Sequence, residues 1–173
     1  MEKKFKNFLA LGVSLSLPLL AGFVGSLYTM PAARSVWYDG LVKSALNPPA
    51  WVFGPVWTLL YLLMGVAVFL VWREYDKLTL SEVEGLIFRR RQIKIALGLF
   101  IAQLILNSFW SIIFFALQNP GWALVEIGFL WLAILATIIA FAKISRLAGW
   151  LLIPYLLWVS LATYLNAAIW WLN

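Results

Sequence analysis

Cysteine and histidine are both absent from the 173 residues of the chain. Without them the chain has no disulfides, no thiol nucleophile, no imidazole general base and none of the usual ligands of structural zinc. The two commonest axial ligands of haem iron are therefore missing as well, and only tyrosine and methionine remain as weaker candidates. We therefore predict neither a metal site nor an obligatory cofactor.

Charged residues are also scarce, at 12% of the chain, whereas 64% of the residues are hydrophobic and the mean hydropathy is +0.93. A soluble domain has about 25% charged residues, so this composition indicates a protein whose solvent is lipid. The formal net charge is +6. Because the basic residues lie at the ends of apolar segments, we assign them to membrane orientation and predict no nucleic-acid partner.

Five apolar segments are long enough to cross a bilayer, which takes about 20 helical residues. Their hydrophobicity is continuous rather than alternating, which favours helices over a barrel. The first segment follows three lysines, but it is longer than the apolar core of a signal peptide, so we interpret it as a retained helix. We predict an all-α integral membrane protein with one domain, residues 1–173, and spans at about 8–28, 52–72, 93–117, 122–142 and 151–171.

The basic residues are distributed unevenly between the two sides of this five-span topology. Eleven lie on the side of the N-terminus, and only Arg34 and Lys43 lie on the other side. By the positive-inside rule, the N-terminus is predicted to be cytoplasmic, with the C-terminus on the opposite side. The Arg73–Lys94 connection, which mixes acidic and basic residues, is expected to be a short amphipathic segment at the cytoplasmic surface.

The connection between the first two spans, residues 29–51, is predicted to form a lid loop on the side away from the cytoplasm. Asn47-Pro48-Pro49 cannot continue a helix, since proline has no backbone donor and pushes the preceding residue to extended geometry. Aromatic residues of the loop and of the helix that follows can form a wall where the two meet. The lid residues are Trp37, Tyr38, Lys43, Pro48, Pro49 and Trp51, and the wall adds Trp57 and Tyr61.

The third span contains polar side chains, Gln103 and Asn107, one turn apart and followed by Trp110. Polar groups in lipid prefer the interior of a bundle, where they meet partners or a ligand. The small residues Gly98 and Ala102 lie in a different sector of the same helix. They permit close approach of another helix, either within the subunit or from a second copy of the chain.

Glu126 is the only carboxylate well inside a span. An intramembrane acid suggests a functional site, although a hydrogen bond to a neighbouring helix explains it more simply. Trp57, Trp110 and Trp158 lie away from the helix ends, where tryptophan usually anchors a membrane protein. Each is a candidate for a pocket, with ordinary helix packing as the alternative.

Several stretches resemble the translocator protein/tryptophan-rich sensory protein family, once called peripheral-type benzodiazepine receptors. They occur in the family's order over nearly the whole chain. The matching stretches are WYxGLxK at Trp37–Lys43, PPxWVxGPVWxxLYxxMG at Pro48–Gly65, QLxLNxxW at Gln103–Trp110, GWALVE at Gly121–Glu126 and LLIPYLLWVSLATYLNxxIW at Leu151–Trp170.

The resemblance implies a five-helix bundle, usually a homodimer, with a pocket beneath the loop between helices one and two. Family members bind porphyrins, cholesterol and synthetic benzodiazepine- or isoquinoline-type ligands. Trp57 and Trp158 match the tryptophan pair that the family implicates in light-dependent porphyrin breakdown. Carried over by motif, the ligand-binding residues are Trp57, Tyr61, Asn107, Trp110, Trp122, Trp158, Ala162 and Leu165.

The chain departs from the family pattern in two places. The lid often reads KPSWxPP, but here residues 43–49 read KSALNPP, without one proline and the tryptophan. The sterol-recognition pattern of the animal proteins needs a basic residue after a tyrosine in the last helix, and no lysine or arginine follows Arg146. We therefore expect no high-affinity cholesterol binding.

Three functions are compatible with these residues. The first is a receptor or sensor for a porphyrin such as protoporphyrin IX or haem, acting in tetrapyrrole metabolism or a stress response. The second is a light-dependent porphyrin-degrading enzyme, in which Trp57 and Trp158 would be the catalytic residues. The third is a porphyrin or lipid translocator, although the sequence shows no internal repeat or charged pathway that favours transport.

Overall fold

The computed structural model of the chain describes residues 2–76, 78 and 83–173. Every regular element in these residues is a helix. The elements are α1 (Glu2–Ala32), α2 (Val36–Gly40), α3 (Ala50–Asp76), α4 (Val83–Ser111) with a π-helical extension η1 (Ile112–Ala116), α5 (Pro120–Ile144), α6 (Arg146–Leu151) and α7 (Ile153–Leu172).

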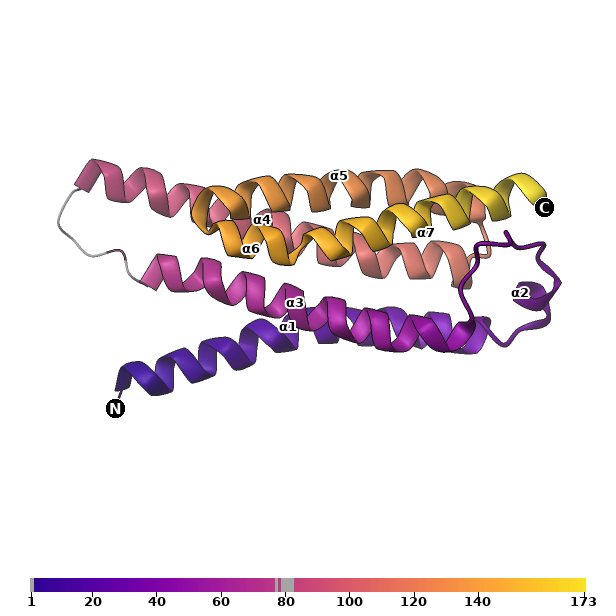
Figure 1. Cartoon of the computed structure of the whole chain (residues 1–173), viewed down its shortest axis with the longest axis horizontal. Coiled ribbons are helices and arrows are strands. Elements are labelled where there is room, and N and C mark those ends of the chain that lie inside the picture. The colour runs from indigo at the N-terminus through magenta and orange to yellow at the C-terminus, as the bar shows by residue number, and fades with distance from the viewer. Residues whose placement is uncertain (1, 77, 79–82) are drawn as a thin grey trace.

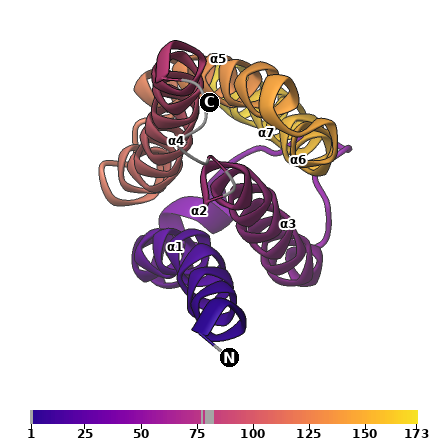
Figure 2. The same ribbon diagram turned by 90° about the vertical axis from the view of Figure 1, so that its left-hand side faces the viewer.

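The long helices run roughly side by side and form a ring when viewed along the bundle (Figures 1 and 2). Helix α1 packs between α3 and α4, α4 packs against α5, and α5 against α6 and α7. The contact of α6 with α3 closes the ring. The interior therefore receives side chains from helices that are far apart in the sequence, such as α3, α4 and α7.

Five helical segments of the described chain are long and apolar enough to cross a membrane, as the sequence predicts. The prediction underestimated their lengths, because helical geometry continues past the apolar core into polar flanks. Two details differ from expectation. The lid contains a short helix, α2. Much of the 73–94 connection is not a separate surface segment but belongs to the ends of α3 and α4; residues 77 and 79–82 of it lie outside the described residues.

Short polar side chains set the boundaries of several helices. The Ser35 hydroxyl accepts a hydrogen bond from the backbone N–H of Tyr38 and begins α2. The side-chain oxygen of Asn119 accepts a hydrogen bond from the backbone N–H of Trp122 at the start of α5 (3.1 Å). Pro120 lies in the first turn of this helix, where a backbone N–H would have no partner within the helix. The Asn119 cap and the left-handed backbone of Gln118 (φ 49°) turn the chain sharply between η1 and α5.

The lid and the C-terminal end of α7 lie together at one end of the bundle, and the N-terminus lies at the other (Figure 1). Asn173 holds the lid backbone, because its side chain accepts from Val42 N–H (2.9 Å) and donates to Val42 C=O (3.2 Å). The lid is thus fixed above the ends of the helices. Which end faces the cytoplasm stays a prediction from the charge distribution.

Candidate functional site

The inner cluster is a group of aromatic side chains from α3 and α7 in the interior of the bundle. Trp57 stacks on Tyr61 with ring centroids 5.3 Å apart, and its edge meets Tyr155 at 6.1 Å. Trp158 packs edge-to-face on Phe53 at 5.7 Å. The i, i+4 spacing of Trp57 and Tyr61 and the i, i+3 spacing of Tyr155 and Trp158 bring each pair to one face of its helix.

A chain of hydrogen bonds connects the inner cluster to α4. The Tyr61 hydroxyl donates to Oδ1 of Asn107 at 3.0 Å, and Nδ2 of Asn107 donates to the Tyr155 hydroxyl at 3.1 Å. All three residues are buried. One carboxamide thus fixes two tyrosines from two other helices, which makes Asn107 the polar centre of the aromatic site.

A second polar connection lies nearer the lid. The indole N–H of Trp110 donates to Oδ1 of Asn166 (3.0 Å), and Nδ2 of Asn166 donates to the carbonyl of Pro120 (2.7 Å). Asn166 lies on α7 and is only 1% exposed. It therefore joins three helices, because it lies on α7, binds the first residue of α5 and holds the Trp110 ring of α4 in place.

The lid cluster is a separate aromatic group beneath the lid. Trp37 meets Phe114 edge-on at 5.9 Å, Tyr38 lies 5.6 Å from Phe115, and Trp110 stacks on Phe114 at 5.0 Å. Trp110 packs against both the lid cluster and the main core. The aromatic wall predicted from the sequence is thus two groups, with Trp110 between them.

Electrostatics within the lid involve Lys43 and Tyr38. The ammonium of Lys43 donates to the carbonyl of Tyr38 and lies 4.4 Å from the centre of its ring. Burial, and then the neighbouring carboxylate of Asp39, raise the pKa of the Tyr38 hydroxyl above its ordinary value. The ring therefore stays neutral, and Lys43 is occupied within the lid, whereas Arg34 is exposed.

The predicted ligand-binding residues fall into two groups. Tyr61, Asn107 and Leu165 are buried, and four others are partly buried against the core: Trp57, Trp110, Trp158 and Ala162. Trp122, in contrast, is 67% exposed at the outer start of α5, and the lid residue Trp51 is 75% exposed on the first turn of α3. Neither of them joins the inner or the lid cluster.

The predicted close-packing pair on α4 lies on the outer surface. Both Gly98 and Ala102 are exposed, and a Cβ added at Gly98 would meet nothing within 4 Å. No described helix of the same chain therefore uses Gly98 as a close-packing site. Of the two interpretations, packing within the subunit is not observed at this position, and packing against a second copy stays a prediction.

The site also includes residues that the sequence analysis did not select. Tyr155 follows Pro154 at the start of an apolar segment, where tyrosine is usually an interfacial anchor. Asn166 lies within the family-like stretch Leu151–Trp170 but was not among the predicted site residues. A signal was present, since residues 155, 158, 159, 162 and 166 are spaced to lie on one face of a helix. Phe53, Phe114 and Phe115 carried no such signal.

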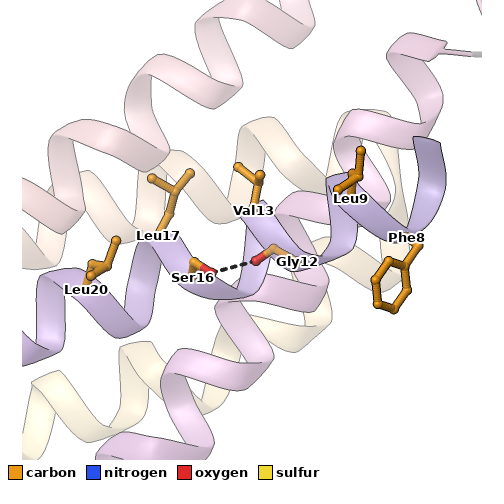
Figure 3. Close-up of a pocket in the computed structure, with 7 residues that line it drawn as sticks. All are labelled: Phe8, Leu9, Gly12, Val13, Ser16, Leu17 and Leu20. Carbon is orange, nitrogen blue, oxygen red and sulfur yellow. Dashed lines mark hydrogen bonds between the residues drawn. The ribbon is translucent and has the colours of Figure 1, made fainter. Parts of the chain in front are cut away.

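Two shallow grooves lie on the outside of the bundle. One follows α1 and is lined almost wholly by apolar side chains, with Ser16 turned to the carbonyl of Gly12 at 2.8 Å (Figure 3). The other lies between α1 and α4 and is lined by residues such as Val24, Ile105 and Phe109. None of the predicted site residues lines either groove, and their apolar surfaces are suited to lipid chains.

Two buried polar side chains have no hydrogen-bond partner within the described part of the chain. Both oxygens of Glu126 and both polar atoms of Gln103 are unpaired. Glu126 is 9% exposed and Gln103 only 1%. Buried polar groups are normally satisfied, so each such exception requires an explanation.

Sequence comparisons relate this chain to known proteins. A sequence model of the TspO/MBR family matches residues 14–172. The chain is 42% identical to the tryptophan-rich protein TspO of Chlorobaculum tepidum, over 97% of this chain and 98% of the relative. It is 40% identical to the human translocator protein over 93% and 88% of the two chains. It is 38% identical to the tryptophan-rich sensory protein of Cereibacter sphaeroides over 75% and 72%.

Proposed function

Because the chain belongs to the TspO/MBR family and is a multi-pass membrane protein, we propose that it is a membrane receptor for a flat, largely apolar tetrapyrrole such as protoporphyrin IX. The observation that carries the proposal is the inner cluster, in which Trp57, Tyr61 and Tyr155 surround one polar centre, Asn107. Apolar sites with a few placed polar groups are the usual form of ligand sites.

The residues present suit such a ligand in three respects. Indole and phenol rings offer flat faces for stacking on a macrocycle. The carboxamide of Asn107 can exchange a tyrosine partner for a ligand atom, since it both donates and accepts. The exposed guanidinium of Arg34 is available on the lid for a propionate, whereas Lys43 would first have to leave the carbonyl of Tyr38.

A porphyrin titration followed by tryptophan fluorescence tests the proposal. We expect saturable quenching by protoporphyrin IX in the intact protein. The Trp57→Ala and Trp158→Ala variants should each bind about tenfold or more weakly, because each loses an aromatic contact worth about 0.5–1.5 kcal/mol in addition to the apolar area that the ring buries. Trp150→Ala is the matched control, since Trp150 is 69% exposed on α6 and should leave the affinity unchanged.

Unchanged affinity in both the Trp57 and Trp158 variants would remove the inner cluster as the binding site. Lack of saturable binding in the intact protein would reject tetrapyrrole recognition altogether. Thermal unfolding of each variant, measured without porphyrin, separates loss of a binding surface from loss of fold.

We further propose a homodimer that packs through the open surface of α4 around Gly98 and Ala102. A Cβ added at Gly98 would meet nothing within 4 Å in the described chain, which supports this proposal, because small residues let the backbones of two membrane helices approach closely. Gly98→Leu should raise the dimer dissociation constant at least tenfold, as measured by cross-linking over a range of detergent dilutions. An unchanged dimer fraction would place the contact elsewhere.

A further inference from the structure

The most informative group that the proposed function does not use is the carboxyl group of Glu126 on α5. It belongs to the buried face of the helix together with Ala123, Ile127 and Leu130. Ile127 and Leu130 belong to the same buried core as Tyr61 and Tyr155. Glu126 therefore lies in the interior of the bundle, with 9% of its surface exposed.

The described residues do not satisfy this carboxyl group. A neutral carboxyl needs an acceptor and an ionised one needs a donor, but neither Glu126 oxygen has a partner in the described part of the chain. The buried polar residues of that part include no lysine or arginine. Burial of a carboxyl without a partner is strongly unfavourable, and a bound ligand is one source of the partner that the described residues do not supply.

We infer that Glu126 accepts a hydrogen bond from an N–H group on the outer edge of an aromatic ligand, as in an indole or an open-chain tetrapyrrole, whereas the N–H groups of a closed porphyrin point to the centre of the ring. The inference rests on the proposed function, since it specifies what the same site recognises. Trp57 and Tyr155 belong to the same core as the neighbours of Glu126, so a flat ring is preferred to a flexible amine. A ring N–H is also a donor that can remain neutral in an apolar interior, where a cation is costly.

Gln103 is consistent with a polar ligand edge. It lies one helical turn before Asn107 on the same face of α4, and its carboxamide is buried with neither its nitrogen nor its oxygen paired in the described chain. The interior thus holds an unpaired carboxyl and an unpaired carboxamide, in addition to the satisfied carboxamide of Asn107. A purely hydrocarbon ligand would leave both of them unsatisfied.

The test compares two probes of the same outline, 2-phenylindole and 2-phenylbenzofuran, which differ only in the exchange of N–H for oxygen. We expect the intact protein to bind the indole at least tenfold more tightly, as measured by tryptophan fluorescence. Glu126→Leu should abolish this preference while retaining the affinity for the benzofuran. Glu126→Gln, which keeps one acceptor oxygen, should retain part of the preference.

Thr137→Val is the matched control, because Thr137 is another buried polar residue of α5, about three turns further along, whose hydroxyl is bound to the carbonyl of Ala133 (2.7 Å). It should leave the preference intact. Equal affinity for the two probes, binding of neither, or a preference that survives Glu126→Leu would each overturn the inference. The protoporphyrin IX titration distinguishes the two proposals. If the protein binds porphyrin but shows no preference for the N–H probe, only the role of Glu126 is rejected. If it prefers the N–H probe but does not bind porphyrin, only the proposal of a tetrapyrrole ligand is rejected.

Discussion

Replacing Asn107 with leucine is expected to weaken porphyrin binding by at least tenfold and to lower the unfolding temperature. The change removes two interhelical hydrogen bonds at once and leaves the hydroxyls of Tyr61 and Tyr155 without their common partner. Interhelical hydrogen bonds in membrane proteins average about 0.6 kcal/mol and reach about 1.7 kcal/mol. The expected loss is therefore about 1–3 kcal/mol, measured by thermal unfolding in detergent.

Ser108→Ala provides the matched control for this variant. Ser108 is the next residue on α4, and its hydroxyl bonds to the carbonyl of Ala21 on α1 (3.1 Å) rather than to the tyrosines. This variant should lose a smaller amount of stability and keep its affinity for porphyrin. If Asn107→Leu and Ser108→Ala behave alike in the titration, Asn107 has no special place in the site and acts only in helix packing.

Tyr61→Phe and Tyr155→Phe can separate the two bonds in a double-mutant cycle with Asn107→Leu. Each single change removes one hydroxyl and keeps the ring, which stacks on Trp57 in the case of Tyr61 and meets it edge-to-face in the case of Tyr155. Because the three side chains form one network, the losses should not add.

The sequence predicts the part of this site that depends on local periodicity. Gln103, Asn107 and Trp110 share a sector because 100° per residue places them there, and the burial of Gln103 and Asn107 follows from the cost of polar groups in lipid. Trp57 and Tyr61 are a pair for the same reason. Nothing local determines which residues these side chains meet. Tyr155 is 48 positions from Asn107, and its partner is fixed only when α7 packs in the ring.

Two features limited prediction from the sequence alone. Residues Trp51 and Trp122 belong to family motifs, but both begin helices, and there an aromatic ring can face outward to lipid and headgroups. The π-helical turn Ile112–Ala116 also breaks the regular 100° progression at the end of α4. Residues beyond Ser111 are therefore displaced from the faces that the regular pattern assigns. The packing of Phe114 and Phe115 beneath the lid depends on that displacement.

Gly65→Ala is expected to destabilise the protein by about 1–3 kcal/mol, the usual cost of overpacking a tight contact. A Cβ at Gly65 would lie 2.8 Å from the Cα of Leu15 and 3.0 Å from the carbonyl oxygen of Ser14, both of which are backbone atoms of α1. Backbone cannot rotate aside, so α1 and α3 would have to separate. Thermal unfolding in detergent measures the loss.

The separation should also reach the aromatic site, which gives this variant a second measurable effect. Gly22 of α1 makes room for the ring of Tyr61, since a Cβ there would lie 2.1 Å from Cε2 of that ring. The position of Tyr61 thus depends on how α1 packs against α3, and moving α1 removes one wall of its space. We expect porphyrin affinity to fall together with stability in Gly65→Ala.

Gly54→Ala is the control on the same helix, because a Cβ at Gly54 meets nothing within 4 Å. Alanine favours a helix over glycine by about 1 kcal/mol in water, so this variant should be neutral or slightly more stable, with unchanged porphyrin affinity. The contrast isolates steric contact from helix propensity, which is the same in both substitutions. Equal unfolding temperatures for the two variants would contradict the close approach of α1 and α3, and with it the dependence of Tyr61 on the first helix.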